Sequence, residues 1–545
     1  MSGVGKGITT SSIGTIFQAR GYKVNIIKAD PYLNVDAGTM NPTEHGEVFV
    51  LNSGLETDQD MGNYERFLNQ DASHADYMTS GMVYQSVIDR ERSLGYGGKC
   101  VEAVPHVRDE IIRRIEDAVK KSKSDISVIE IGGTVGDYQN IMFIEAARVL
   151  KLRQKDDVAV IMVSYLPIPG TIGEMKTRPT QHALHQLNSY GLHADFIIAR
   201  AETELDDRRK EKLSISCNIP VEHIISAPDI KSIYDVPENF EKDRLGNLLE
   251  QVLSLTKKKS NLKEWSSFAK KVHTVKKEVT IAVVGKYFDT GDFVLSDAYV
   301  SVIEAIKFSA YAVGVKPKLL WLNSKQFEGA GGALMCKKIL ADVDGIIVPG
   351  GFGSTGIEGK IAVISYARNN KIPYFGLCYG MQLLVIEYAR NVASLSGAHT
   401  VEVDKSTPYP VIATMEEQKK KIKEGNFGGS MRLGAYPCLL KKGTVSYKAY
   451  TSAKVGTETK QGRLVNERHR HRYEVNEAYI AMLEKAGMVF SGTSPEGHLM
   501  EIAELKEEVH PFFVGTQFHP EFLARPLAPH PLFTAFIKAS LKKNK

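Results

Sequence analysis

The hydrophobic residues of this chain gather in short, nearly continuous runs separated by longer amphipathic stretches. In the first half these runs occupy residues 23–28 (KVNIIK), 126–131 (ISVIEI), 158–164 (VAVIMVS) and 196–199. Continuous apolar runs are typical of parallel strands covered on both faces, because neither side of such a strand meets water. The alternation of such runs with amphipathic stretches predicts an α/β fold.

The pattern changes at residues 257–277, a lysine-rich and polar stretch (KKKSNLKEWSSFAKKVHTVKK) that we interpret as a solvated interdomain linker. A second series of apolar runs follows at residues 280–284 (TIAVV), 345–349 (GIIVP) and 373–378 (PYFGLC). A chain of 545 residues is also too long for one hydrophobic core. The sequence therefore predicts two doubly wound α/β domains, residues 1–256 and 278–545, joined by this linker.

Composition narrows the class of protein. The formal charge of +5 is too small for this length to argue for a nucleic-acid partner, and anionic small molecules in local basic pockets fit it equally well. No apolar run approaches the roughly 20 residues that cross a bilayer, and no signal-like segment precedes the first motif. The five cysteines show no metal-ligand spacing. We expect a cytoplasmic protein with no membrane partner.

A candidate nucleophile lies at residues 376–380 (GLCYG), between an apolar strand and the helical run 381–388. This arrangement is typical of the strand–turn–helix "nucleophile elbow", with Cys378 where hydrolases carry serine. A buried, inert cysteine at a strand end explains the residues equally well. The elbow alone leaves both interpretations open.

Two further segments favour the catalytic interpretation. His519, in residues 518–521 (FHPE), can take the proton of Cys378 and later return it to ammonia, and Glu521 can orient the imidazole. Residues 349–353 (PGGFG) follow a strand, and their backbone N–H groups can stabilise an oxyanion.

The combination of these three segments resembles the class I (triad) glutamine amidotransferase family. The resemblance makes Cys378 the nucleophile, His519 the base and Glu521 its orienting partner. It also implies a set of oxyanion and glutamine-binding residues: Gly351, Tyr379, Gln382, Glu402 and Arg472. Residues 429–434 (GSMRLG) and 467–474 (ERHRHRYE) resemble the form of this domain found in the CTP synthase family.

The first residues of the chain predict a phosphate-binding loop. Residues 2–7 (SGVGKG) open a predicted helix that runs to about Arg20, so that backbone N–H groups and Lys6 face an anion. Gly7 stands where a strict P-loop carries Ser or Thr, and Thr9 and Thr10 lie one turn further on.

A succession of motifs follows that loop: residues 28–36 (KADPYLNVD), 44–50 (EHGEVFV), 56–62 (ETDQDMG) and 130–137 (EIGGTVGD). Their order closely resembles the synthetase domain of the CTP synthase family. The resemblance implies that Asp58 and Glu130 hold Mg²⁺, a metal that prefers carboxylate oxygens. It assigns ATP to Gly3, Gly5, Lys6, Gly7 and Asp58, and UTP or CTP to Ser2, Lys28, Asp137, Gln139, Lys176, Arg178 and Gln181.

The resemblance also implies a reaction. ATP phosphorylates the 4-oxygen of UTP, ammonia released from glutamine attacks carbon 4, and phosphate leaves. Pro42, His45 and Val48 line the implied ammonia passage. Family members use GTP as an activator and CTP as a feedback inhibitor, and they assemble as homotetramers and often as filaments.

The chain departs from the family pattern in four places. It starts almost inside the phosphate loop, without the strand that precedes this loop in the family. Gln139 replaces an acidic residue, Arg178 replaces lysine, and Tyr379 stands where leucine is common. Two alternatives to an active CTP synthase stay open: a non-catalytic paralogue acting as a filament or regulatory subunit, and another ATP-driven amide-forming synthetase.

Overall fold

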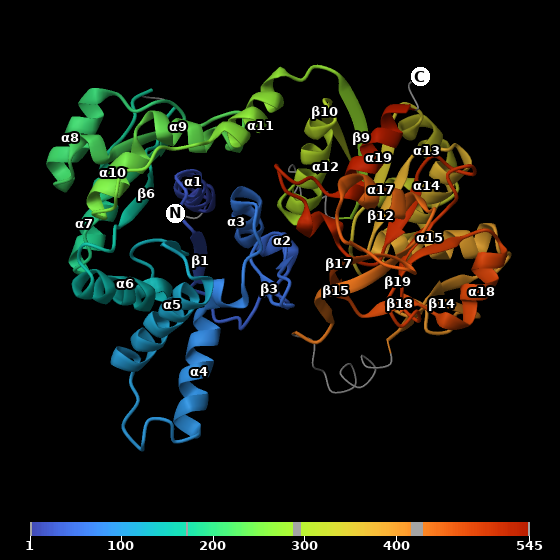
Figure 1. Ribbon diagram of the computed structural model, residues 1–545, viewed down its shortest axis with the longest axis horizontal. Coiled ribbons are helices and arrows are strands. Elements are labelled where there is room, and N and C mark those ends of the chain that lie inside the picture. Colours follow the sequence, from blue (N-terminus) through green and yellow to red (C-terminus); the bar gives the residue numbers. More distant parts are fainter. Residues whose placement is uncertain (1–2, 171–172, 287–295, 416–428, 543–545) are drawn as a thin grey trace. The chain divides into compact units, whose positions relative to one another are not determined.

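The computed structural model describes residues 3–170, 173–286, 296–415 and 429–542. The chain forms two compact units (Figure 1). The first comprises Met1–Asp36 and Asn63–Lys270, and the second comprises Ala37–Gly62 and Lys271–Lys545. The segment Ala37–Gly62, expected in the N-terminal domain, therefore packs with the C-terminal half. None of the described helices is long and apolar enough to cross a bilayer.

The first unit contains two parallel three-stranded sheets with the strand orders β4-β1-β5 and β6-β7-β8. The strands are β1 (Val24–Asp30), β4 (Tyr77–Thr79), β5 (Ile126–Ile131), β6 (Ile161–Tyr165), β7 (Phe196–Ala201) and β8 (Ile224–Pro228). The helices are α1 (Lys6–Ala19), α3 (Asp60–Leu68, whose first three residues belong to the second unit), α4 (Ser80–Arg92), α5 (Arg108–Ser122), α6 (Ile141–Arg153), α7 (Arg178–Ser189), α8 (Asp207–Cys217), α9 (Val236–Lys242), α10 (Leu245–Val252) and α11 (Lys263–Thr274). The four strands expected from apolar runs are confirmed, and the third begins three residues later than its run.

Helix α1 is fixed at both ends. Gly3 and Gly5 adopt left-handed backbone angles, with φ of 71° and 84°, which favour glycine. At the other end, the buried Arg20 pairs with Glu241 of α9 at 2.8 Å and with Glu250 of α10 at 2.9 Å. The helix predicted to follow the phosphate loop is thus confirmed, and two buried ion pairs hold its C-terminal end.

The expected linker is partly a packed helix. Trp265, Phe268 and Ala269 of α11 are buried, and the Trp265 indole N–H donates to the Tyr234 carbonyl at 2.8 Å. The expectation of a solvated connector is wrong for these residues. Their helical spacing (265, 268, 269) gives α11 an apolar face despite the surrounding lysines.

The second unit is built on one ten-stranded sheet with the order β10-β9-β11-β12-β21-β20-β19-β15-β17-β16. Its strands are β9 (Glu278–Gly285), β10 (Lys316–Asn323), β11 (Gly345–Val348), β12 (Tyr374–Leu377), β15 (Arg432–Lys441), β16 (Thr457–Glu458), β17 (Gly462–His471), β19 (Val489–Thr493), β20 (Met500–Glu504) and β21 (Phe513–Thr516). Strands β13 (Ala398–Thr400), β14 (Tyr409–Thr414) and β18 (Tyr473–Val475) form a small second sheet. The helices are α12 (Val300–Ala312), α13 (Gly332–Leu340), α14 (Ile357–Asn369), α15 (Tyr379–Asn391), α17 (Val445–Ala453), α18 (Glu477–Lys485) and α19 (Pro531–Lys542). Segment Ala37–Gly62 adds α2 (Pro42–His45), β2 (Phe49–Val50) and β3 (Glu56–Thr57).

Three neighbouring strands of the large sheet, β11, β12 and β21, run parallel. Leu377 of β12 pairs with Thr516 of β21, so the residues after these strands emerge at the same edge. The predicted catalytic segments 349–353, 376–380 and 518–521 all follow this edge. In an open α/β sheet the carboxyl ends of the strands are the usual place for a site.

Arg20→Met tests the anchoring of α1. The variant leaves the fully buried Glu250 carboxylate without its guanidinium partner, so we expect the first unit to lose about 3 kcal/mol of stability. Thermal unfolding followed by intrinsic fluorescence measures the change. Lys442→Met, which removes an exposed ion pair with Glu458, is the matched control and should unfold like the parent protein. Equal unfolding temperatures for the two variants would contradict the anchoring role.

Candidate active site

The predicted elbow is present, and its strained residue is the cysteine. Cys378 lies between β12 and α15 with φ 49° and ψ −97°, a conformation that costs a non-glycine residue free energy. Its N–H donates to the Thr516 carbonyl at 2.6 Å, which fixes the turn to β21. The sulfur is buried, with 5% of the residue exposed.

The flanking glycines have a different role from the one expected. Neither Gly376 nor Gly380 has a positive φ. Instead, a Cβ at Gly380 would lie 2.2 Å from the Val348 carbonyl oxygen, and one at Gly376 would lie 2.6 Å from the Gly380 carbonyl carbon. The glycines therefore permit close packing of β11, β12 and α15, and this packing holds Cys378 in its strained form.

The histidine and glutamate of the predicted triad are paired. His519 Nδ1 lies 2.7 Å from Glu521 Oε1, and both residues are buried. A Cβ at Gly350 would lie 2.9 Å from His519 Cε1 and 3.8 Å from Cys378 Cβ, so the glycine after Pro349 lies directly against both side chains. The structure thus brings together all three segments that the sequence singled out.

The environment of His519 fixes its protonation. Burial lowers the pKa of the imidazole, but the charges of Glu521 and Cys378 and their hydrogen bonds outweigh it and raise the pKa to about 10. A raised imidazole pKa favours transfer of a proton to the ring, and a cysteine is a better nucleophile as thiolate. The role of His519 as the base stays a prediction.

Two charged side chains, Glu402 and Lys286, bind the backbone of the glycine-rich loop after β11. The Gly353 N–H donates to Glu402 Oε1 at 2.8 Å, and Lys286 donates to the Phe352 carbonyl. Burial raises the pKa of Glu402, against the opposing effects of the Gly353 hydrogen bond and the Lys286 charge. Gly351 lies beside the Tyr379 ring, where an added Cβ would be 3.9 Å from Cδ1. The proposed oxyanion donors, Gly351 and Tyr379, thus border one small region.

The other two residues predicted to bind glutamine lie on α15 and directly after β17. Gln382 is buried on α15 and donates to the Tyr473 carbonyl at 3.0 Å, while Arg472 donates to Ser430 Oγ at 2.9 Å. Sequence reasoning missed Gln517, whose side-chain amide lies 3.6 Å from the Cys378 sulfur and 3.5 Å from the Gln382 amide. Its position two residues before His519 is the feature of the sequence that could have indicated this contact.

A second group of charged residues lies in the first unit, at the carboxyl ends of β1 and β5. Lys28 and Glu130 pair in register across these strands, with Nζ and Oε1 2.8 Å apart, and Lys28 also lies 3.6 Å from Asp30. The Tyr64 hydroxyl donates to the other Glu130 oxygen at 2.6 Å, a contact that the sequence did not reveal. All four side chains are buried.

The phosphate loop reaches this group through Lys6, whose ammonium donates to the Gly133 carbonyl at 3.0 Å. Gly7 lies in the first turn of α1, and Ser2 lies outside the described residues. A lysine ammonium at a helix N-terminus, bonded to the loop that follows β5, is the donor chemistry that a polyphosphate requires.

The carboxylates in this part of the chain fit magnesium carried on a nucleotide. Among the described residues, no group of three or more His, Cys, Asp or Glu side chains could form a closed metal cage. Magnesium commonly uses one or two carboxylates together with phosphate oxygens and water. Glu130 provides one such carboxylate. Asp58 belongs to the second unit, where its side chain accepts from the Asp60 N–H at 2.9 Å.

The residues assigned to UTP or CTP lie in two places in the first unit. Asp137 accepts from the Thr134 N–H at 3.1 Å, and Gln139 is exposed in the turn after β5. Lys176 pairs with Glu174 at 2.6 Å just before α7, where Arg178 is the first residue and Gln181 is buried. The two places follow different sheets, so their joint use for one nucleotide stays a prediction.

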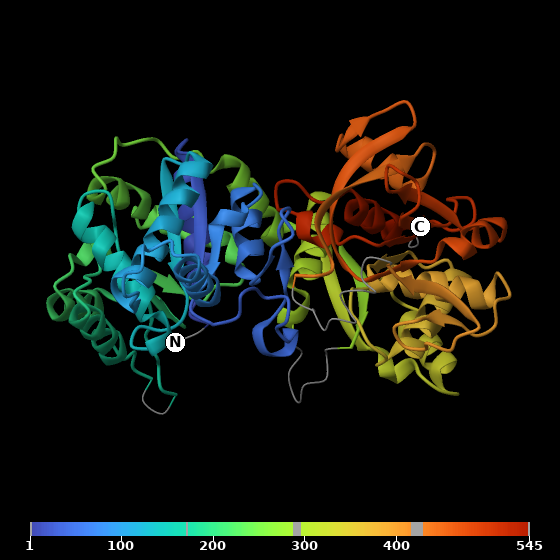
Figure 2. The ribbon, with the colours of Figure 1, turned by 90° about the horizontal axis from the view of Figure 1, so that it is seen from below.

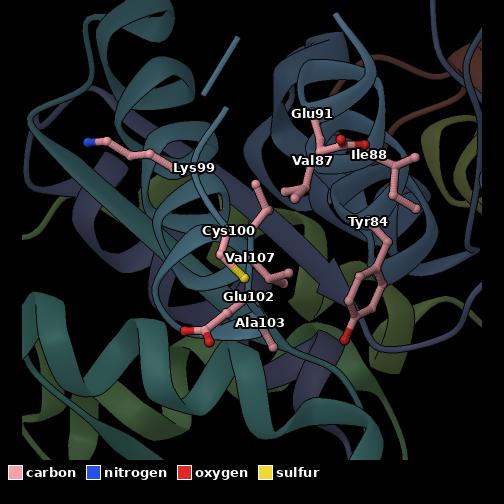
Figure 3. A pocket seen from close by; sticks show the side chains of 10 residues that line it. Tyr84, Val87, Ile88, Glu91, Lys99, Cys100, Glu102, Ala103 and Val107 are labelled. Atoms are coloured by element: carbon pink, nitrogen blue, oxygen red, sulfur yellow. The ribbon is translucent and has the colours of Figure 1, made fainter. Parts of the chain in front are cut away.

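A cavity of about 530 Å³ lies elsewhere in the first unit (Figure 3). Tyr84, Val87, Ile88 and Glu91 of α4 line one side, and residues 99–103 with Val107 line the other. No residue that the sequence assigns to catalysis or to a nucleotide is among them.

The pairing of His519 with Glu521 can be tested on the thiol itself. Glu521→Gln removes the charge that raises the His519 pKa, so the imidazolium beside Cys378 becomes less stable. We expect alkylation of Cys378 by iodoacetamide at pH 7 to slow about tenfold. Peptide mass spectrometry resolves Cys378 from the exposed Cys100.

The same pair also makes the stability of the folded state depend on pH. The raised pKa stabilises the folded state below the unfolded value of 6.5, and this stability is lost as the pH rises through about 10. Glu521→Gln should shift that alkaline loss toward neutral pH. Glu507→Gln, which affects only an exposed pair with Lys448, should leave both the alkylation rate and the alkaline transition unchanged. An unchanged rate in Glu521→Gln would refute the assignment.

The two halves of the chain match different family models. Residues 1–255 match the CTP synthase N-terminus, and residues 294–539 match the class-I glutamine amidotransferase. The glutaminase domain of Trypanosoma brucei CTPS with bound acivicin is 36% identical, covering 48% of this chain and 94% of that one, with a TM-score of 0.43.

Curated relatives align along the whole chain. The CTP synthase of Pyrococcus furiosus is 46% identical over 99% of this chain and 96% of its own length. That of Caldanaerobacter subterraneus is 45% identical with the same coverage, and that of Bacillus licheniformis is 44% identical over 100% and 97%. With each half matched by its own family model and these relatives aligned nearly end to end, this chain belongs to the CTP synthase family.

Proposed function

We propose that this protein converts UTP to CTP, using ATP to activate the pyrimidine and glutamine as the source of ammonia. The observation that carries the proposal is the buried Cys378–His519–Glu521 triad in a chain that aligns with CTP synthases over nearly its full length. Family membership makes the protein a glutamine-hydrolysing ligase.

Glutamine hydrolysis starts as His519 takes the proton of the Cys378 thiol. The sulfur attacks the side-chain amide carbon, and the N–H groups of Gly351 and Tyr379 stabilise the oxyanion. His519 then gives its proton to the leaving ammonia, which leaves a thioester on Cys378. Water attacks the thioester, passes a proton to His519 and releases glutamate. Glu402 and Arg472 match the ammonium and carboxylate ends of the substrate, and Gln382 lines the site between them.

UTP activation uses the charged residues at the carboxyl ends of β1 and β5. Lys6 and Lys28 hold the phosphate of ATP that moves to the uracil 4-oxygen, while residues 176–181 and Asp137 hold UTP. Ammonia forms a bond to carbon 4, the bond from carbon 4 to the phosphorylated oxygen breaks and the nitrogen releases one proton, which gives CTP and phosphate. Magnesium, which Glu130 and Asp58 would hold, neutralises phosphate charge when bound.

Further properties are proposed from the family alone. They are ammonia transfer along Pro42, His45 and Val48, activation by GTP, feedback inhibition by CTP, assembly as a homotetramer with filaments, and a cytoplasmic location. Gln139 and Arg178 stand at positions predicted to read the nucleotide. Because arginine presents a planar fork where lysine presents a point charge, the response to CTP is where this protein should differ from its relatives.

Cys378→Ala separates the two half-reactions. The variant lacks the nucleophile, so we expect glutamine-dependent CTP formation to fall by about 10⁴-fold or more. CTP formation from added ammonium chloride should persist, because this substrate bypasses glutamine. Both are followed by the absorbance change from UTP to CTP. A parent protein that forms no CTP from either nitrogen source would overturn the proposed function and favour a non-catalytic paralogue.

Glu130→Gln tests the proposed activation of UTP by ATP. Removing this carboxylate takes away the counter-charge of Lys28 and one proposed magnesium ligand, so ammonia-dependent CTP formation should fall at least about 100-fold. Basal glutamine hydrolysis, measured as glutamate release without nucleotides, should stay near the parent rate. If both CTP formation and glutamine hydrolysis were lost while thermal unfolding stayed unchanged, the proposal that the two reactions use separate groups of residues would be contradicted.

A further inference from the structure

Residues 49–57, hereafter the hairpin, come from the N-terminal half of the sequence but pack against the strands of the glutamine-hydrolysing centre. Strands β2 and β3 pair antiparallel, and the Thr57 hydroxyl donates to the Phe49 carbonyl at 2.8 Å. The Ala435 N–H of β15 donates to the Asn52 carbonyl at 3.0 Å. A Cβ at Gly54 would lie 2.8 Å from the Leu433 carbonyl oxygen, so the hairpin turn lies directly on β15.

Arg468 links the hairpin to the catalytic histidine. Its fully buried guanidinium donates to Asn52 Oδ1 at 2.6 Å and to the Val50 carbonyl at 3.1 Å. The backbone carbonyl of Arg468 accepts the N–H of His519 at 2.8 Å. The side chain of this residue therefore holds the hairpin while its backbone holds the base.

Arg470 makes the corresponding link to the nucleophile. Its Nε lies 2.7 Å from Glu56 Oε1, in a pair whose carboxylate is 1% exposed. The carbonyl of Arg470 lies 3.8 Å from the Cys378 sulfur. Because alternate residues of a strand share an orientation, Arg468 and Arg470 use β17 in the same way, with side chains on the hairpin and carbonyls on the triad.

An aromatic contact gives a third link. The Phe49 ring meets the Phe522 ring edge-on, with centroids 5.1 Å apart, and Phe522 stacks on the His519 imidazole at 5.1 Å and 15°. Figure 1 labels the hairpin strand β3 next to helix α2 of the same segment, and Figure 2 shows the ribbon turned by 90° and seen from below.

We propose that the hairpin is a positioning element of the glutamine-hydrolysing centre, with Glu56 acting through Arg470 and Phe49 acting through Phe522. Neither residue is among those predicted to bind glutamine. Glu56 holds the backbone of β17 against the Cys378 sulfur, and Phe49 holds the plane of the His519 ring. The inference rests on the proposed glutaminase activity, and it makes residues of the N-terminal sequence part of that activity.

Glu56→Gln in the full-length protein is the test. The variant keeps the shape of the side chain but removes the charge that holds Arg470. Because small displacements of catalytic groups are costly, we expect kcat for glutamine hydrolysis to fall about tenfold, with KM for glutamine changed less than about twofold. Alkylation of Cys378 should slow in parallel. Glu507→Gln, the same substitution at the exposed pair with Lys448, should change neither.

Two more variants separate positioning from general destabilisation. Arg470→Met removes the pair with Glu56 and also a donation to the Gly38 carbonyl at 3.4 Å, so it should cost at least as much as Glu56→Gln. The double variant should cost no more than Arg470→Met alone, because the pair is already lost. Phe49→Leu removes the ring that meets Phe522, so it should lower kcat with the Glu56–Arg470 pair intact. Thermal unfolding of every variant is measured alongside.

The outcomes distinguish this inference from the proposed function. Equal glutaminase kcat in Glu56→Gln, Glu507→Gln and parent protein would overturn the positioning role, as would fully additive losses in the double variant. Ammonia-supported CTP formation by the parent protein reports the proposed function separately. If the parent forms no CTP yet hydrolyses glutamine, and Glu56→Gln does so about tenfold more slowly, the positioning role stands and CTP formation fails.

Discussion

The strained backbone of Cys378 is the constraint on which the second unit depends. A φ of 49° with ψ of −97° is unfavourable for a residue with a Cβ, by about 1–3 kcal/mol, and it persists only where neighbouring structure leaves no alternative. Here the constraint comes from both sides of the turn. The Tyr374 hydroxyl donates to the Gly380 carbonyl at 2.9 Å, and the Cys378 N–H is held by Thr516. Parallel pairing of β11, β12 and β21 then places the glycine-rich loop and His519 around the sulfur.

Buried charge has a different role in each unit. Beside the triad, Glu501 is fully buried between His469 and Arg432, at 2.7 and 2.8 Å. Burial alone would raise its pKa, but these two partners lower it to about 2, so the carboxylate stays ionised and braces β20, β15 and β17. In the first unit, the buried ammonium of Lys28 lies between two carboxylates at the end of a strand. The first arrangement has its charges satisfied within the sheet, whereas the second presents charge where a nucleotide phosphate is proposed to arrive.

Much of this organisation could be predicted from the sequence, because local signals carried it. The apolar runs predicted the strands, and the motifs around Cys378 and His519 predicted that the two residues act on one proton. Features that depend on long-range packing could not be predicted. No sequence pattern in residues 49–57 indicates that they contact β17, more than 400 positions away. In the sequence, Glu56 is simply one acidic residue in a polar motif. Gln517 and Tyr64 were missed for the same reason, since their contacts exist only in the fold. The spacing of the apolar residues of α11 could have predicted its buried face. The surrounding lysines led instead to the prediction of a solvated linker.

The contact between the hairpin and β17 also has a consequence for the order in which the protein forms. Arg468 and Asn52 are 416 positions apart in the chain. At ordinary translation speeds the ribosome needs roughly 20 to 80 s to make that stretch. During this interval the hairpin has been synthesised, but the strand that covers it has not. All residues of the first unit precede position 271, whereas the second unit cannot be completed until β17 has been synthesised. The hairpin must therefore remain available until β17 emerges, and the second unit forms only when these two distant segments meet.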